Sequence, residues 1–323
     1  MSAIPQPSQN QSSQAAYPFL RVAQLFISGV PEWRGGGAQS QMIQIIGDGT
    51  TSNLRIRFEI RKHQQSASAP TFIYVYNLSQ ALRQTLAKIA GKTLGGSEIE
   101  LKVGWQNFPA ATIFSGTLLA CFSERQEADI VTSLVSLAGY GGMMSTVLSQ
   151  TWAGGSSLLS IIKNIAGQIP GVTVGQINVT DRKMGTQGYS MAGGAQQHLN
   201  DLARTYGFRY GIDKGVFTAC DDTKVLSETT VPLLSFKNGF LKRIEPMLFA
   251  PFQQVQGWTI QSLINPHVNV GASVQVESQI NPQYNGKYPV NTLSITGDTH
   301  GNEWDMRIES LLIGPDLPTP FAG

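Results

Sequence analysis

Hydrophobic and polar residues alternate along several stretches of the chain, most clearly from residue 53 to residue 62. Apolar residues occupy every second position there: Leu54, Ile56, Phe58 and Ile60. Three arginines and a glutamate stand between them. A period of two predicts a β-strand with one dry face and one charged face. Further strands are predicted at residues 71–77, 99–105, 112–122 and 129–139.

Three segments instead have the 3.6-residue period of a helix. Ser79 precedes the first, which spans residues 79–90, and Ser156 or Ser157 precedes the second, LLSIIKNIAGQI. A serine at this position can accept hydrogen bonds from the unpaired N–H groups of the first turn. The third helix is predicted within residues 194–207. It leads into a hairpin, FRYGIDKGVFTAC, that turns on Asp-Lys-Gly.

The order of these elements divides the chain into two β parts separated by an α+β part. The stretch YGGMMS, between a strand and the second helix, is predicted to be a glycine-rich loop. Strands return after residue 236, among them QVQGWTIQ, ASVQVESQ and NEWDMRIESLLI. The predicted division is a flexible tail 1–17, a β domain with one helix 18–150, a connecting α+β domain 151–235, a second β domain 236–314 and an extended tail 315–323.

Charge excludes some classes of function. Only 14% of the 323 residues are charged, the net charge is +2, and no run of five basic residues occurs, so charge does not indicate nucleic-acid binding. The N-terminus has no apolar signal-peptide core. The uncharged segment 130–162 contains too much Ser, Thr and Gly for a membrane span. Cys121 and Cys220 are interpreted as free thiols of a protein made in a reducing compartment.

The stretch GDTHGNEWDM, residues 297–306, has the densest group of potential metal ligands or acid–base groups. We expect a hairpin with Gly301-Asn302 as a two-residue turn. His300 would then face Glu303, and Asp298 would face Asp305. All four side chains would share one side of the hairpin, as a metal site requires.

Extending the same register favours a simpler interpretation. The polar side continues along both strands, and an apolar side lies behind it: Leu293, Ile295, Trp304, Met306 and Ile308. We therefore expect an exposed, solvated polar hairpin face, made of Asp298, His300, Glu303, Asp305 and Arg307. The sequence predicts no catalytic, cofactor-binding or metal residues. The sequence leaves open whether a bound cation offsets the repulsion between the carboxylates of Asp298 and Asp305.

Other motifs give no chemistry. The Gly-Lys-Thr at residues 91–93 lacks the preceding glycine of a phosphate-binding loop, because Leu86 stands at that position. The chain has no GxSxG, CxxC or HExxH motif. His63, His198 and His267 are isolated in the sequence. Four tryptophans are interpreted as core residues: Trp105, Trp152, Trp258 and Trp304.

With these elements in order, the chain resembles the tail hub proteins of contractile-tailed bacteriophages. In that family a strand, the letters NLS, a helix, a strand ending in Gly-aromatic and a strand containing IFxG follow one another. Here they are Ile73–Ser79, Ile99–Trp105 and Ile113–Gly116. The two central helices and the closing segment INPQYNGKYPVNTLSITGDTHGNEWDM are also similar, so the resemblance covers about residues 18–314.

The resemblance implies an α+β, mainly β fold, with two tail-tube-like antiparallel barrel or sandwich domains around the α+β domain. It implies a non-enzymatic homotrimer in the virion, assembled in the host cytoplasm. Its expected partners are the hexameric tail tube protein and the trimeric central spike, with tape measure and baseplate wedge proteins as further candidates. The trimer would form part of the channel for DNA ejection, and the polar hairpin face would suit its water-filled lumen. The resemblance implies no specific nucleic-acid binding, no cofactor and no membrane.

Two alternatives stay open. One is a tail-associated cell-wall hydrolase with Glu303 and Asp305 as its carboxylates, since a glycosidase needs only two. The other is a different tail component, such as a tube initiator or a wedge protein.

Overall fold

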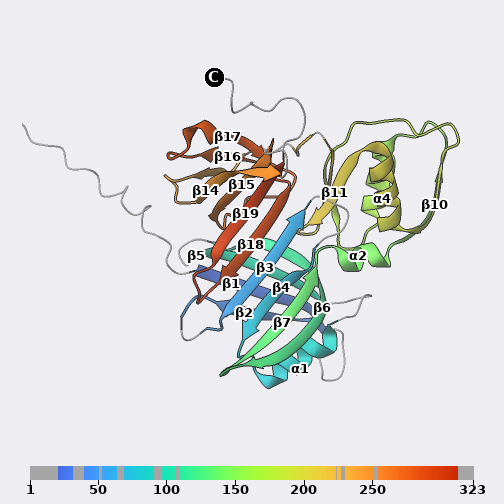
Figure 1. The fold of residues 1–323 in the computed structure, drawn as a ribbon. Helices are drawn as coiled ribbons and strands as arrows, with labels where there is room; N and C mark the ends of the chain where they lie inside the picture. The colour runs from blue at the N-terminus through green and yellow to red at the C-terminus, as the bar shows by residue number, and fades with distance from the viewer. Residues whose placement is uncertain are drawn as a thin grey trace, which may run out of the picture.

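The computed structural model describes residues 21–31, 40–50, 53–63, 69–90, 97–105, 109–222, 224–226, 230–249 and 254–311. The predicted tails, 1–17 and 315–323, and the Gly-Lys-Thr motif at 91–93 lie outside these ranges. Strands dominate the described part, and most of them belong to one eleven-stranded sheet (Figure 1). The predicted α+β, mainly β fold is therefore confirmed.

The first β part supplies seven strands and one helix. They are β1 (Arg21–Pro31), β2 (Ser40–Gly47), β3 (Ile56–His63), β4 (Thr71–Tyr76), α1 (Gln80–Ile89), β5 (Glu98–Trp105), β6 (Ala111–Gln126) and β7 (Asp129–Leu137). The alternation seen in the sequence is preserved in β3, where Ile56, Phe58 and Ile60 are buried. Ser79 caps α1, and its hydroxyl accepts a hydrogen bond from the N–H of Leu82.

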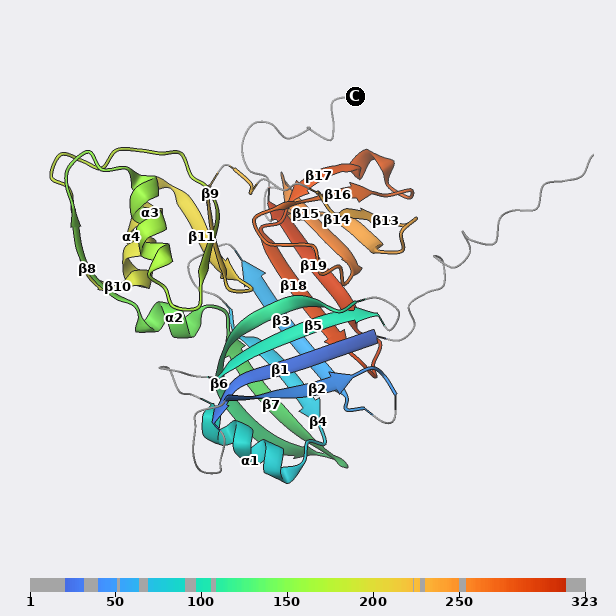
Figure 2. The same cartoon turned by 180° about the vertical axis from the view of Figure 1, so that it is seen from behind.

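The long strand β6 belongs to two differently directed parts of the sheet. Its first part, up to Thr117, pairs with β5, and its outer half, Leu118–Gln126, pairs with β7. A register shift between Leu118 and Ala120 marks the change. At this point the sheet folds over on itself, so that β5, β1 and β2 form a second layer across β3, β4 and β18 (Figure 2). The two layers enclose the main hydrophobic core.

The second β part extends the same sheet. It supplies β14 (Leu241–Phe249), β15 (Gln254–Leu263), β18 (Thr292–Asp298) and β19 (Trp304–Leu311), and β18 pairs directly with β3. A small sheet of β13 (Leu233–Ser235), β16 (Ser273–Glu277) and β17 (Gly286–Pro289) packs against it. The sequence pattern missed β14, since Pro246 interrupts it. Proline is tolerated there because β14 is the last strand of the sheet.

The α+β part has its own core, beside the large sheet (Figure 2). Its elements are α2 (Tyr140–Ser145), β8 (Val147–Trp152), α3 (Leu158–Gly167), β9 (Thr173–Asn178), β10 (Tyr189–Gly194), α4 (Ala195–Tyr206), β11 (Phe208–Asp213) and β12 (Val216–Asp221). Of the two candidate serines, Ser157 caps α3. The hairpin of β11 and β12 turns on Lys214 and Gly215 as predicted, both with positive φ.

The prediction of a loop at YGGMMS was wrong. These residues form the short helix α2, and its N–H groups bond to carbonyls four residues back: Met143 to Gly139 at 3.0 Å and Thr146 to Gly142 at 3.2 Å. Glycine is a poor helix former, so the pattern favoured a loop. The tertiary structure overrides this preference, because Met143 is buried in the core of the α+β part.

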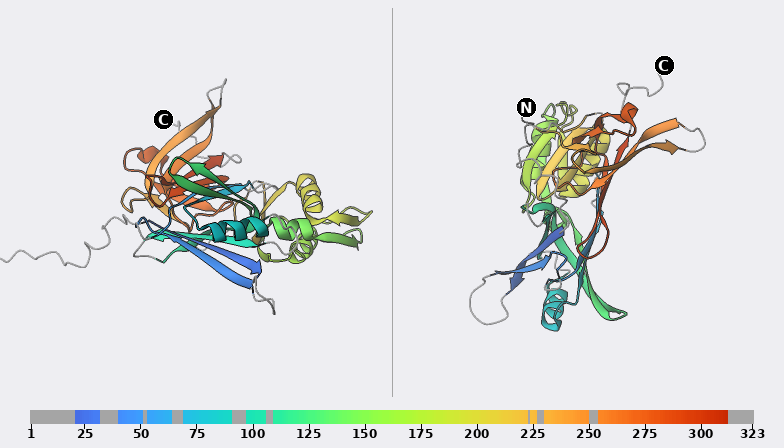
Figure 3. Two further views of the ribbon diagram at one scale, coloured as in Figure 1. Left: turned by 90° about the horizontal axis from the view of Figure 1, so that it is seen from below. Right: turned by 90° about the vertical axis from the view of Figure 1, so that its left-hand side faces the viewer.

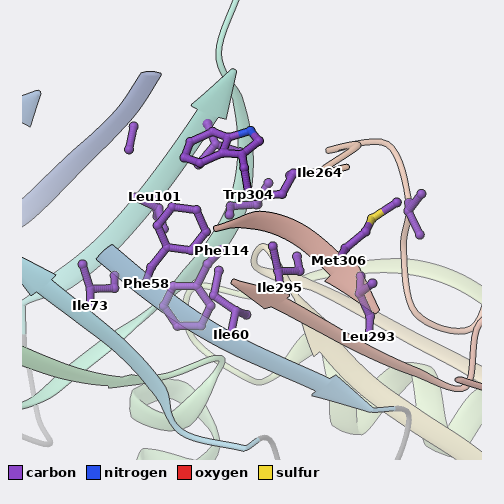
Figure 4. Close-up of a cluster of buried hydrophobic side chains, with 14 of the residues drawn as sticks. Phe58, Ile60, Ile73, Leu101, Phe114, Ile264, Leu293, Ile295, Trp304 and Met306 are labelled. Carbon is purple, nitrogen blue, oxygen red and sulfur yellow. The ribbon is translucent and has the colours of Figure 1, made fainter. Parts of the chain in front are cut away.

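Trp304 lies near the centre of the main core, where strands from both β parts meet (Figure 4). It is 1% exposed, with Phe58 of β3 at 5.6 Å and Trp105 of β5 at 5.9 Å between ring centroids. Gly297 lies opposite Trp304, and any Cβ there would overlap the Phe58 ring. Trp304 and Trp258 are fully core residues, and Trp105 and Trp152 are partly buried against the cores.

Two lysines join the α+β part to the two β parts of the chain. Lys62, at the end of β3, forms a 2.6 Å ion pair with Asp213 at the end of β11. The ammonium of Lys214 donates to the carbonyl of Pro266 at 3.2 Å and to the side-chain oxygen of Asn269 at 3.0 Å. The junction therefore connects all three parts of the chain. In the described residues, no helix is long and apolar enough to span a membrane.

The stability of this junction should depend on pH. Burial, together with the nearby charge of Lys62, lowers the pKa of Lys214 to about 8 from its ordinary 10.5. Between these values the unfolded chain holds the proton and the folded protein releases it, so stability rises with pH across this window. Denaturant unfolding measured across this pH window gives the free energy of unfolding of each protein. We expect it to rise with pH more in the native protein than in Lys214→Met, by at most about 3 kcal/mol. Lys287→Met, at an exposed lysine, is the control; parallel curves for all three proteins would contradict the prediction.

Candidate functional site

The hairpin of β18 and β19 has a longer turn than the sequence predicts. Gly297 pairs with Trp304, and the N–H of Asp298 donates to the carbonyl of Glu303 at 2.8 Å. Asp305 lies opposite Thr296, so the predicted pairing of Asp298 with Asp305 was wrong. The amphipathic character of the hairpin holds in this register, with alternate residues of both strands buried.

Local hydrogen bonds from side chains explain the longer turn. The Asp298 carboxylate accepts from the N–H of His300 at 3.0 Å, a turn that Asp favours. The hydroxyl of Thr299 accepts from the N–H of Ile56 at 3.0 Å and thereby fixes the turn to β3. His300 is exposed, and its Nδ1 lies 3.0 Å from the Thr299 hydroxyl oxygen. His300 thus does not face Glu303 across the turn.

Asp298 is buried, 4% exposed, rather than part of an open polar face. Its partner is Arg55, whose Nε lies 3.0 and 3.2 Å from the two carboxylate oxygens and whose Nη2 lies 2.5 Å from one of them. Burial alone would raise the pKa of Asp298, but the hydrogen bonds and charge of Arg55, with the N–H of His300, outweigh it and lower the pKa. Asp298 is therefore a charged, paired group that anchors the turn.

A second arginine, Arg21, binds the backbone carbonyl oxygens of the turn. Nη1 of Arg21 lies 2.5 Å from the carbonyl oxygen of Gly301, 3.3 Å from that of Asp298 and 3.2 Å from that of Glu303. Nη2 donates to the carbonyl of Asn302 at 3.1 Å. The guanidinium carbon also lies 5.7 Å from the centre of the Trp304 ring. The oxygens that could attract a cation therefore bind a side chain from β1.

The remaining charged residues of the hairpin also have partners. Glu303 lies 3.7 Å from Nε of Arg57, Asp305 pairs with Lys242 of β14, and Arg307 lies 3.6 Å from Glu309. Taken alone, the hairpin is acidic on its polar side, but β3 and β14 bring cations beside it. Within the described ranges, no group of three or more His, Cys, Asp or Glu side chains is arranged to hold a metal ion.

The polar face of the neighbouring strands continues this pattern of alternating charge. Arg57 bonds to Glu59 at 2.7 Å on β3, and Arg243 pairs with Glu245 on β14. Ion pairs exposed to water contribute little stability individually. They do affect the electrostatic potential at the surface. Because positive and negative groups lie close together, their potentials largely cancel a short distance from the sheet.

The arginines at the turn were missed in the sequence. Arg21 and Arg55 lie 277 and 243 residues from Asp298 along the chain. Arg55 was assigned to the charged side of the predicted strand 53–62, and in the structure it lies just before β3. Nothing in the sequence shows which strand lies next to β3. Lys242 escaped notice because β14 itself was not predicted.

One comparison identifies the family. A family model described as baseplate hub gp41 matches residues 41–308 of the chain. The chain belongs to this baseplate hub family. No curated protein matches it at the level required for a relative. The resemblance to tail hub proteins seen in the sequence is confirmed, and the protein is a structural component of a phage tail baseplate.

Solved structures of tail proteins share the fold. A tail protein from Neisseria meningitidis MC58 aligns with a TM-score of 0.57 at 10% identity, covering 90% of this chain and 96% of that one. The 43 kDa tail protein of prophage MuSo2 from Shewanella oneidensis gives 0.54 at 11%, covering 90% and 97%. The E. coli c3393 protein, a type VI secretion component described as similar to T4 tail proteins gp27 and gp5, gives 0.54 at 8%, covering 81% and 75%.

Removing the cation beside Asp298 should destabilise the fold. Arg55→Met leaves a buried carboxylate without its partner, and we expect a loss of about 3 kcal/mol at neutral pH in denaturant unfolding. Because the native pKa of Asp298 is lowered, the stabilisation exists above its unfolded pKa and disappears as the pH falls through the folded value. The native protein should therefore lose more stability on acidification than the variant.

Arg61→Met is the matched control, since Arg61 is an exposed arginine of β3, the strand that Arg55 directly precedes. A loss in the control equal to that in Arg55→Met would contradict the assigned role of the Asp298 ion pair.

Proposed function

We propose that this protein is the trimeric hub that joins the hexameric tail tube to the trimeric central spike and forms part of the channel for DNA ejection. The observation that carries the proposal is a repeat in the order of the strands. Eight strands of the large sheet form a continuous run, β14-β15-β19-β18-β3-β4-β7-β6. The run consists of two halves with the same topology.

Each half contains two hairpins arranged in the same way. In the first β part the order is β3-β4-β7-β6, and in the second it is β14-β15-β19-β18. If the four strands of each half are named A to D in chain order, both read A-B-D-C. One chain thus carries two equivalent modules side by side, joined by the contact of β18 with β3.

Two equivalent modules per chain are what an adaptor between threefold and sixfold symmetry requires. Three copies arranged head to tail around an axis present six modules to a hexameric neighbour and three chains to a trimeric one. This supports a division of the chain into two tube-like domains at 18–150 and 236–314 with a connecting domain at 151–235. The tail tube and the spike protein are the proposed partners, with tape measure and wedge proteins as further candidates.

The polar face of the eight-stranded run suits a lumen through which DNA passes. Its carboxylates on β3, β14, β19 and the turn before β19 are paired with arginine or lysine side chains. A strongly basic lining would hold phosphate groups, and its affinity would depend steeply on salt. A face with paired charges does not hold them in this way. We place the exposed hairpin residues His300, Glu303, Asp305 and Arg307 on this lining.

The two alternatives lead to different measurements. A cell-wall hydrolase with Glu303 and Asp305 as its carboxylates would clear a peptidoglycan suspension, and Glu303→Gln would abolish the clearing. Each of these carboxylates lies beside a cation on the open face of the sheet. A tube initiator would have the mass of a hexamer rather than a trimer.

The proposed assembly is tested by mass in solution. Light scattering or native mass spectrometry of the purified protein should give three times the chain mass of 34.9 kDa. Adding the tube protein and the spike protein should give one complex that contains both. A monomer or a hexamer under all these conditions would overturn the proposal.

A further inference from the structure

The eight-stranded run ends in two edges at which the described residues provide no further strand. One is the outer half of β6, which pairs with β7 alone, and the other is β14, which pairs with β15 alone. Residues 122–126 of β6 are all exposed, and the Phe122 side chain is 53% exposed. Both hairpins extend away from the body of the molecule (Figure 3, right). Edges of this kind are sites at which another chain can add to a sheet.

The repeat makes these two edges the counterparts of a joint that already exists within the chain. In the A-B-D-C order, β18 is strand C of the second half and β3 is strand A of the first, and they pair over seven residues. The outer half of β6 is strand C of the first half, and β14 is strand A of the second. Among the described residues, each copy therefore has a C edge and an A edge to which no further strand is paired.

Strand direction permits the same joint between copies. Every neighbouring pair in the eight-stranded run is antiparallel. With an even number of alternating strands, the first and last run in opposite directions. In a head-to-tail ring, β6 of one copy would thus meet β14 of the next in the antiparallel orientation of the β18–β3 joint.

The backbone groups of the β18–β3 joint belong to residues that face the core. The N–H of Thr299 donates to the carbonyl of Ile56 at 3.0 Å, and Ile56 is a fully buried residue of β3. Because these groups alternate in direction along a strand, the core-facing residues of β3 point their N–H and C=O at β18. Its polar residues point theirs at β4.

The free edge of β6 has the same alternation. The N–H of Asn77 donates to the carbonyl of Ile130 at 2.8 Å. The backbone groups of Ile130 therefore point toward β4, and those of Val131 point toward β6. Val131 pairs with Glu124, which consequently bonds to β7. Ser123, the next residue, lies on the core side of the strand and directs its N–H and C=O outward.

The free edge of β14 matches it. The N–H of Leu263 donates to the carbonyl of Phe240 at 2.8 Å, which fixes the direction of the groups along β15. Because these groups alternate, the backbone N–H and C=O of Arg243 and Glu245 bond to β15. The backbone groups of Ile244 and Pro246 therefore point outward, away from β15. Ile244 is a core residue. Pro246 removes one donor from this edge, which limits its pairing with unrelated strands.

We infer that the outer half of β6 in one copy pairs with β14 in the next copy, so that the joint between chains repeats the β18–β3 joint within the chain. The two edges agree in direction and in which residues supply the backbone bonds. They also agree in face, because on both edges the backbone groups that point outward belong to residues on the core side of the sheet. This inference rests on the proposed ring of three copies and identifies the surface that closes it.

A proline at the β6 edge tests the inference. Ser123→Pro removes an outward N–H and leaves the bonds of Phe122 and Glu124 to β7 in place. The matched control is Ser123→Ala, which also loses the hydroxyl contact with Thr132 at 3.0 Å but keeps the N–H. We expect Ser123→Pro to shift the mass from three chains to one at micromolar concentration, while Ser123→Ala stays trimeric. Circular dichroism establishes that both variants are folded.

Cross-linking tests the same contact without relying on loss of assembly. Polar-face residues of the joint form the pairs without mutual hydrogen bonds, whose Cα atoms lie about 4.5 Å apart and fit a disulfide. In a Cys121→Ser background, Glu124→Cys combined with Arg243→Cys or with Glu245→Cys should give two- and three-chain species on oxidation in at least one combination. Glu124→Cys combined with Lys287→Cys should remain single chains.

The outcomes separate this inference from the proposed function. A trimeric Ser123→Pro together with no cross-link in either combination would overturn the edge pairing and leave the trimeric hub intact. A native protein that never forms a trimer, even with its tube and spike neighbours, would overturn the hub proposal itself.

Discussion

The antiparallel pairing of β18 with β3 is the contact on which the rest of the structure depends. It joins segments more than two hundred residues apart into one sheet, and it aligns the apolar faces of both β parts over a shared core. Loop-closure entropy opposes such a distant contact, so it needs strong compensation. Burial of Trp304 against Phe58 and the absence of a side chain at Gly297 supply close packing on the apolar side.

On the other side of the same joint, charged groups fix the end of the hairpin. Arg55 neutralises the buried Asp298, and Arg21 binds the carbonyls of the turn from the opposite layer of the sandwich. A buried charge is tolerated only where it is paired and hydrogen-bonded, so these contacts specify one register as well as one partner strand. The turn is thus a structural anchor, and the exposed charges beside it belong to a face on which opposite charges are paired.

Much of the fold follows from local patterns in the chain. The alternation in residues 53–62, the cap at Ser79 and the Asp213-Lys214-Gly215 turn each predict their element because the decisive interactions lie within a few residues. The errors have the opposite origin. YGGMMS is helical because Met143 is drawn into a core, and β14 contains a proline that only an edge strand accepts. Local preference is weak enough for tertiary packing to override it.

The sequence by itself determined which side of each strand is dry, where most helices begin, and the family to which the chain belongs. It could not determine which strands are neighbours, because the alternation of apolar and polar residues is the same in every strand and does not identify the strand with which it pairs. Only the tertiary structure placed Arg21, Arg55 and Lys242 beside the acidic hairpin. The apparent cluster of metal ligands is thereby resolved into carboxylates that each lie beside an arginine or a lysine. The free energy of a charge depends on its neighbours in space, and those neighbours come from distant parts of the chain.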